Sequence, residues 1–153
     1  MPSKLVEGAT APDFALRSQT GENVRLNDFI DKKVVVLYFY PKDFTPGCTT
    51  EACTFRDSYE DFKDLGAQVI GISSDSVESH KKFAQKYNLP FQLLSDEDGE
   101  VRELYGAQKS GGLSTRSTFV IDKKGVIRMI FSSQLQARKH IEEALGIVKL
   151  LVQ

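Results

Sequence analysis

Hydrophobic and polar positions follow two different periods along the chain, and each change of period marks a predicted element. Residues 34–40 form an uninterrupted apolar run in which β-branched and aromatic side chains dominate. Such a run is typical of a central strand that is buried on both faces. From Pro46 to about Leu65 the apolar positions recur at steps of three and four residues, which predicts a helix that ends at Gly66.

The rest of the chain supplies further strands and helices in a regular order. Residues 13–16 and 23–26 predict an N-terminal β-hairpin, and residues 118–121 and 126–131 predict a second antiparallel hairpin. After the first helix and before the second hairpin we expect four elements: strand 69–72, a helix capped by Asp75 or Ser76, strand 91–94 and a short helix 99–105. A last helix begins near Gln136. Residues 106–117 are polar and contain glycine, so we expect a mobile connection there.

This order of elements predicts one α/β domain over residues 1–153. Alternating βαβ units favour parallel strands, whereas the hairpins require antiparallel ones. The prediction is therefore a mixed central β-sheet with helices on both faces and an N-terminal β-hairpin.

Composition narrows the classes of partner and location. The 20 basic and 21 acidic side chains leave a net charge of −1, which gives no reason to expect nucleic acid or an anionic membrane as a partner. No apolar run approaches the ~20 residues of a membrane span, and the N-terminus lacks the apolar stretch of a secretory signal. We therefore expect a cytoplasmic protein; a mature plastid protein whose transit peptide has been removed would look the same.

The candidate chemistry lies between the buried strand and the first long helix, in residues 41–53. Thr45 suits the N-cap of that helix and Pro46 its first position, which places Cys48 in the first turn. Unpaired backbone N–H groups and the helix dipole favour a thiolate there, and the thiolate is the nucleophilic form of cysteine. Cys48 is therefore the candidate nucleophile.

Cys53 is the only other cysteine, and two close cysteines are compatible with catalysis, metal binding or no function. If both are helical, they lie ~7.5 Å apart along the axis and about 140° apart around it, with Cα atoms on the order of 8–9 Å apart. This separation exceeds the ~7 Å limit for a disulfide. A bond between them would require the first turns to melt, and Gly47 with Thr49 and Thr50 makes that stretch a weak helix former.

These residues resemble the active-site signature of the peroxiredoxin family, in which a proline, a threonine and the peroxidatic cysteine have the spacing of Pro41, Thr45 and Cys48. A second cysteine five positions later, here Cys53, is similar to the bacterioferritin comigratory protein or peroxiredoxin Q subfamily. The resemblance covers nearly the whole chain, with further matching segments at residues 8–14, 36–41, 71–73, 94–96 and 116–122.

The resemblance implies a thioredoxin-like fold and a thiol peroxidase for antioxidant defence. Cys48 would reduce hydrogen peroxide or alkyl hydroperoxides and become a sulfenic acid, which Cys53 would resolve as a disulfide. Thioredoxin, or alternatively a glutaredoxin, would restore both thiols. The subfamily is often monomeric, so a monomer is expected, and the reaction needs no metal, haem or flavin.

The resemblance also implies roles for four neighbours of the cysteines. Thr45 would hydrogen-bond the thiolate and the peroxide, and Arg116 would stabilise the thiolate and polarise the O–O bond. Pro41 would shield the site. Glu51 matches a position that often holds Glu or Gln and would orient the arginine.

Two other functions use the same cysteines. A thiol-disulfide oxidoreductase usually carries a C-x-x-C motif, which is absent here. A non-enzymatic redox sensor would form the same disulfide but turn over poorly. His80 and His140 lack the spacing of a zinc site, and each lies on a predicted helix among charged neighbours.

Overall fold

The computed structural model of the chain describes residues 5–107, 116–133 and 136–152. Residues 108–115, the middle of the segment expected to be a mobile connection, lie outside the described residues. In chain order the elements are β1 (Ala15–Ser18), β2 (Asn23–Arg25), a 3-10 helix η1 (Leu26–Phe29), β3 (Val34–Phe39), α1 (Pro46–Asp57), α2 (Tyr59–Asp64), β4 (Ala67–Ser73), α3 (Val77–Tyr87), β5 (Gln92–Ser95), α4 (Glu100–Leu104), β6 (Ser117–Ile121), β7 (Ile127–Ser132) and α5 (Ala137–Leu151).

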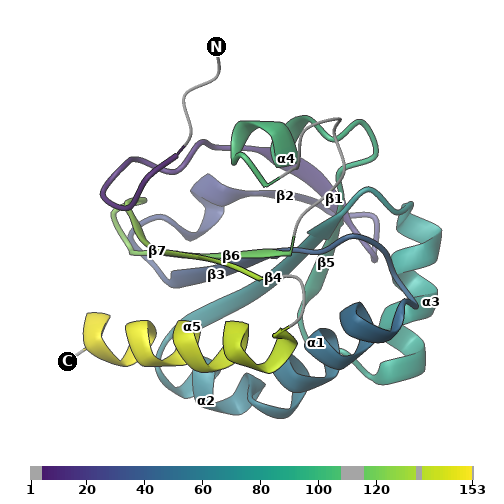
Figure 1. The fold of residues 1–153 in the computed structure, drawn as a ribbon. Helices are drawn as coiled ribbons and strands as arrows, with labels where there is room; N and C mark the ends of the chain where they lie inside the picture. The colour runs from purple at the N-terminus through teal and green to yellow at the C-terminus, as the bar shows by residue number, and fades with distance from the viewer. Residues whose placement is uncertain (1–4, 108–115, 134–135, 153) are drawn as a thin grey trace.

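The described strands form one seven-stranded sheet in the order β2-β1-β5-β4-β3-β6-β7 (Figure 1). β3 is parallel to β4 and antiparallel to β6, so the sheet is mixed. The N-terminal hairpin joins the sheet through antiparallel pairing of β1 with β5, and β6 and β7 form the second hairpin. The predicted mixed α/β architecture and both hairpins are confirmed.

Every residue of β3 is buried, which confirms the prediction of a strand covered on both faces. Val36 and Tyr38 belong to the core beneath α1, α2, α3 and α5. Leu37 and Phe39 belong to a second core beneath the N-terminal segment, η1 and α4. Helices therefore cover both faces, but unequally: Figure 1 shows α1, α2 and α5 on one side of the sheet and α4 on the other.

The single helix predicted from Pro46 to about Leu65 is wrong in one respect, because it is divided at Ser58 into α1 and α2. The backbone of Ser58 has φ −100° and ψ 2°, and its N–H donates to both Thr54 and Phe55 carbonyls. The apolar stripe continues across this tighter turn, and Phe55 and Phe62 are both fully buried. Gly66, with a positive φ of 78°, ends α2 as predicted.

Ser76 rather than Asp75 caps α3, because its side chain accepts the Ser79 N–H at 3.1 Å.

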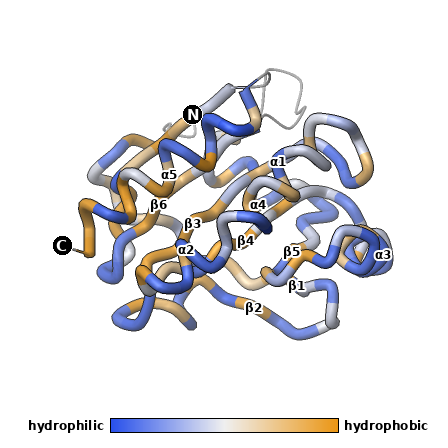
Figure 2. Tube along the Cα trace, turned by 90° about the horizontal axis from the view of Figure 1, so that it is seen from below, coloured by the Kyte–Doolittle hydropathy of each residue, from blue (hydrophilic) through white to orange (hydrophobic). Residues whose placement is uncertain are grey.

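Hydropathy follows the layers of the fold. Figure 2 shows β3 and β4 as hydrophobic in the interior, whereas α3 is largely hydrophilic. No helix in the described part of the chain combines the length and apolar character needed to cross a membrane.

Candidate active site

Cys48 lies where β3 gives way to α1, and this junction fixes its surroundings. Pro46 occupies the first turn of α1, with Thr45 at the N-cap position, so Cys48 lies in that first turn as predicted. Its thiol is only 1% exposed and packs in the core beneath α1. Both features follow from a loop that starts at the carboxyl end of a buried strand.

Arg116 reaches Cys48 because β6 runs antiparallel to β3. Ser117, the first residue of β6, pairs with Phe39, the last residue of β3, so the residue before Ser117 lies beside the start of α1. The Nη2 of Arg116 donates to the Cys48 sulfur at 3.5 Å. The structure thus brings together two predicted site residues that are 68 positions apart.

Gly47 is a part of this site that the sequence reasoning missed. A Cβ atom at this position would lie 2.8 Å from the Arg116 Nη2, closer than real Cβ contacts allow. The glycine therefore makes room for the guanidinium beside the Cys48 sulfur. Its only signal in the sequence was a weak helix former within the first turn of a helix.

Glu51 is fully buried one turn after Cys48 and holds the other side of the guanidinium. The Nη1 of Arg116 donates to Glu51 Oε1 at 2.7 Å. Burial raises the pKa of Glu51 to about 8, although Arg116 opposes that rise. Burial lowers the pKa of Arg116, but the charges of Glu51 and Cys48 outweigh it, so that pKa is raised. Burial therefore favours the neutral form of the Glu51 carboxyl below about pH 8, even beside the Arg116 guanidinium.

His140 on α5 lies behind Glu51 and was not predicted to belong to the site. Its Nε2 lies 2.8 Å from the Ser133 carbonyl, and its Nδ1 lies 2.7 Å from the Thr118 hydroxyl. Burial lowers the pKa of His140, which keeps the ring neutral with the proton on Nε2. Nδ1 then accepts from Thr118 and lies 3.7 Å from Glu51 Oε2, an oxygen for which the described residues provide no hydrogen bond.

The Thr45 side chain differs from the expectation. Its hydroxyl donates to the Lys42 carbonyl at 2.8 Å and makes no capping hydrogen bond to α1. Because a hydroxyl has one proton, Thr45 does not donate to the Cys48 thiolate in this arrangement, and only its lone pairs remain for a peroxide. Pro41 is exposed at the start of the same loop, and its shielding role stays a prediction.

The loop between β3 and α1 is held by a buried network around Asp43 that the sequence reasoning also missed. The Asp43 carboxylate accepts from the Tyr40 hydroxyl at 2.6 Å and the Ser79 hydroxyl at 2.8 Å, and lies 2.8 Å from His80 Nδ1. Ligand-type atoms of Asp43, Asp75 and His80 lie within 4.8 Å of one another. The hydrogen bonds already made by these atoms explain the grouping without an ion.

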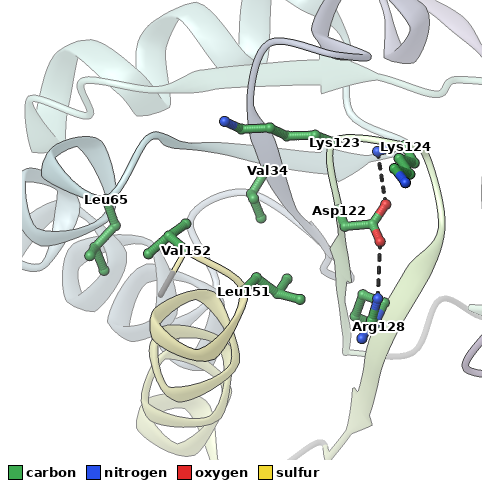
Figure 3. A pocket seen from close by; sticks show the side chains of 8 residues that line it. All are labelled: Val34, Leu65, Asp122, Lys123, Lys124, Arg128, Leu151 and Val152. Carbon is green, nitrogen blue, oxygen red and sulfur yellow. Dashed lines mark hydrogen bonds and ion pairs between the residues drawn. The ribbon is translucent and has the colours of Figure 1, made fainter.

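Two cavities of about 500 Å³ lie away from the Asp43 network. One touches α1 at Gly47 and Thr50 and is otherwise lined by the start of α5. The other lies at the far end of the sheet, where Val34 begins β3 (Figure 3). Its apolar wall includes Leu65 and Leu151, and Asp122 on its other wall pairs with Arg128 at 3.2 Å. It contains none of the predicted site residues.

Comparison with known proteins assigns the chain to a family. A model of the AhpC/TSA family matches residues 8–130. The chain is 52% identical over 151 residues to "Peroxiredoxin Q, chloroplastic" of Sedum lineare, covering 97% of this chain and 81% of that protein. The chain belongs to the AhpC/TSA family, in its peroxiredoxin Q group. The corresponding protein of Arabidopsis thaliana is 52% identical over 149 residues, covering 96% of this chain and 68% of the relative.

Solved structures extend the match to the whole fold of this peroxiredoxin. Peroxidoxin BcpB from Mycobacterium tuberculosis superposes with a TM-score of 0.89 and 38% identity, covering 95% of this chain and 97% of that one. A cysteine-to-serine mutant of PrxQ from Xylella fastidiosa gives a TM-score of 0.90 and 31% identity, with 99% of both chains covered. These relatives confirm the thioredoxin-like fold and a peroxidase, an oxidoreductase enzyme.

The two cysteines of this peroxiredoxin are both reduced and both helical. Cys48 and Cys53 lie in α1 with free thiols, and Cys53 is half-buried. Helix geometry keeps them too far apart to bond without a change of backbone. The predicted reduced form, with its helix intact, is therefore the form that the structure describes.

Proposed function

We propose that this peroxiredoxin reduces hydrogen peroxide and organic hydroperoxides through a Cys48 sulfenic acid, which Cys53 resolves as an intramolecular disulfide. The observation that carries the proposal is the buried Cys48 sulfur with Arg116 Nη2 at 3.5 Å. In a site that excludes water, one fixed guanidinium can stabilise the thiolate before the reaction and the leaving oxygen during it.

In the first step the Cys48 thiolate attacks the terminal oxygen of the peroxide. An S–O bond forms, the O–O bond breaks, and the leaving oxygen departs as an alkoxide or hydroxide that takes up one proton. Cys48 is oxidised to a sulfenic acid and the peroxide is reduced to an alcohol or to water. Arg116 would stabilise the leaving oxygen, and Thr45 would accept a hydrogen bond from the peroxide hydroxyl.

In the second step the Cys53 thiol attacks the sulfenic sulfur, which gives the disulfide and releases water. The sulfurs can meet only after the first turns of α1 unwind. Exchange with an external dithiol, by resemblance thioredoxin, then breaks the disulfide and returns both thiols while the external protein is oxidised.

We also propose that the protein acts as a monomer on peroxides and has neither nucleic acid nor a membrane as a partner. The net charge of −1 supports this view. Large exposed apolar side chains are few in the described part of the chain: Val6, Phe44 and Leu104 come from three separate segments, and Leu150 and Val152 lie together at the end of α5. The word chloroplastic in the names of the plant relatives supports the plastid alternative, and a cytoplasmic location stays a prediction. Light scattering of the purified chain should give a mass near 17.1 kDa.

The decisive experiment couples peroxide consumption to thioredoxin, thioredoxin reductase and NADPH. Wild type should turn over many times, and Cys48→Ser should be inactive because a serine hydroxyl is not ionised at neutral pH. Cys53→Ser should form the sulfenic acid, detected by a trapping reagent, but lose recycling. Substantial turnover by Cys48→Ser would overturn the assignment, and normal recycling by Cys53→Ser would remove Cys53 from the cycle.

Hydrogen exchange tests the unwinding step independently. The disulfide form should exchange backbone amides of residues 46–53 faster than the reduced form, while β3 and β4 stay protected. Equal protection of α1 in the two forms would contradict an unwinding step. The Cys53→Ser protein, which cannot form this disulfide, is the matched control.

A further inference from the structure

The peptide unit that joins Lys42 to Asp43 is hydrogen-bonded at both ends. Its N–H, from Asp43, donates to Asp75 Oδ2 at 2.8 Å. Its carbonyl, from Lys42, accepts the Thr45 hydroxyl at 2.8 Å. Because a peptide unit is planar, fixing the direction of its N–H also fixes the direction of its carbonyl. Asp75 therefore determines where the acceptor for the Thr45 proton points.

Asp75 is itself held by the end of β4. The Ser73 hydroxyl donates to Asp75 Oδ2 at 2.6 Å, and the Asp75 N–H donates to Ser73 Oγ at 3.2 Å. Ser73 is the last residue of β4, the strand that pairs in parallel with β3. The carboxylate is thus attached to the same rigid sheet from which the Cys48 loop begins.

The other side of the loop is anchored as well. The buried Asp43 carboxylate is held by Tyr40, Ser79 and His80, and the His80 Nε2 lies 3.0 Å from the Leu94 carbonyl of β5. These contacts leave the peptide unit before Asp43 little freedom to rotate.

Phe44 shows that the loop is constrained. It has a φ of +66°, which is rare for a bulky side chain and persists only where the surroundings impose it. Its ring packs edge-on against Phe83 of α3 at 5.1 Å. The residue just before Thr45 is therefore held in one conformation.

We propose that Asp75 is a positioning residue that makes Thr45 an obligate hydrogen-bond acceptor toward the peroxide. This inference rests on the proposed function, since it needs a peroxide beside Cys48. With its proton committed to Lys42, the Thr45 hydroxyl can only accept a hydrogen bond from a bound molecule. Only the terminal oxygen of an organic hydroperoxide carries a hydrogen. Thr45 therefore selects that oxygen for attack by Cys48 and leaves the substituted oxygen as the leaving group.

The test compares Asp75→Ala, Thr45→Val and the double variant in reduced protein. The rate constant for Cys48 oxidation by cumene hydroperoxide, followed by rapid quenching and mass spectrometry, should fall about tenfold in Asp75→Ala. In Thr45→Val this rate constant should fall at least as much, and in the double variant it should match that of Thr45→Val within about twofold. Asp75→Asn keeps an acceptor oxygen and should recover to within about threefold of wild type.

A second readout separates positioning from general damage. Alkylation of Cys48 by iodoacetamide needs the thiolate but no acceptor at Thr45, so its rate in Asp75→Ala should stay within about twofold of wild type. Asp122→Ala is the matched control. Asp122 is also half-buried and accepts two backbone N–H groups, but it lies at the far end of β6 (Figure 3). The Asp122→Ala substitution should lower the unfolding temperature without slowing Cys48 oxidation.

The outcomes distinguish the two proposals. If wild-type Cys48 is not oxidised by peroxide, the proposed function fails. If wild type reacts but the losses from Asp75→Ala and Thr45→Val multiply in the double variant, Asp75 does not act through Thr45. Equal losses in oxidation and alkylation would likewise show that Asp75 only maintains the fold of the loop.

Discussion

Replacing Glu51 by glutamine should change how the stability of the reduced protein depends on pH. The carboxyl is completely buried, and its charged partner is the Arg116 guanidinium at 2.7 Å. Burial dominates and raises the pKa of Glu51 from 4.5 to about 8. Glutamine has nearly the same shape, keeps an acceptor for Arg116 and does not titrate.

The sign and size of the effect follow from this difference. Between pH 4.5 and about 8 the folded protein holds a proton on Glu51 that the unfolded chain has released. The contribution of this proton to the free energy of unfolding is fully present below pH 4.5 and is lost as pH rises through about 8. Raising a carboxyl pKa by this much corresponds to about 5 kcal/mol. Relative to wild type, Glu51→Gln should therefore gain up to about 5 kcal/mol across this range.

The assay is urea unfolding of reduced protein at several pH values from 5 to 9, with the free energy of unfolding extrapolated to water. Glu60→Gln, at an exposed position of α2, is the matched control for the loss of one carboxyl group. Parallel pH profiles for wild type and Glu51→Gln would refute the reasoning. They would show that Glu51 is ionised in the folded protein beside the Arg116 guanidinium.

Three substitutions test the packing around the site. Gly47→Ala places a Cβ 2.8 Å from the Arg116 Nη2 and should slow Cys48 oxidation about tenfold in a rapid-quench assay; an unchanged rate would mean that the guanidinium can move without cost. Gly71→Ala places a Cβ 2.8 Å from the Tyr38 ring and should cost about 1–3 kcal/mol in urea unfolding, whereas a stabilised protein would contradict that clash. Phe55→Ala, which removes a buried ring stacked on Tyr38 at 4.5 Å, should cost about 3–5 kcal/mol, and a loss below about 1 kcal/mol would show that the core closes over the gap.

Much of the fold could be predicted because it depends on local patterns. The apolar run of β3 and the glycine after α2 are direct consequences of burial and backbone freedom. The break at Ser58 has no such signal, since neither glycine nor proline marks it and the apolar spacing continues across it. Tertiary packing of α1 and α2 decides that turn, and sequence periodicity does not register it.

The site was predictable in its residues but not in its hydrogen bonds. Cys48 and Arg116 could be named from a motif and from family resemblance, and the structure brings them into contact. The direction of the Thr45 hydroxyl depends on a carbonyl three residues earlier, which no pattern of residue types records. His80 lies on a predicted helix among charged neighbours, yet it is buried against Asp43, 37 positions away, because β3 and β4 are parallel neighbours.

The roles proposed for Thr45 and Cys48 make opposite demands on the backbone: one residue must stay fixed and the other must move. The proposed role of Thr45 requires a fixed orientation, and the loop before Thr45 is hydrogen-bonded to Asp75 after β4 and, through Asp43, to α3. In the proposed cycle Cys48 moves toward Cys53 after oxidation, and Cys48 lies beyond those anchors in the first turn of α1. That turn contains Gly47, and glycine weakens a helix. In that cycle, oxidation of Cys48 would alter the sulfur that Arg116 contacts and so weaken one contact on the part of α1 proposed to unwind. Unwinding should therefore begin after Thr45 and leave the peroxide-binding loop in place for the next turnover.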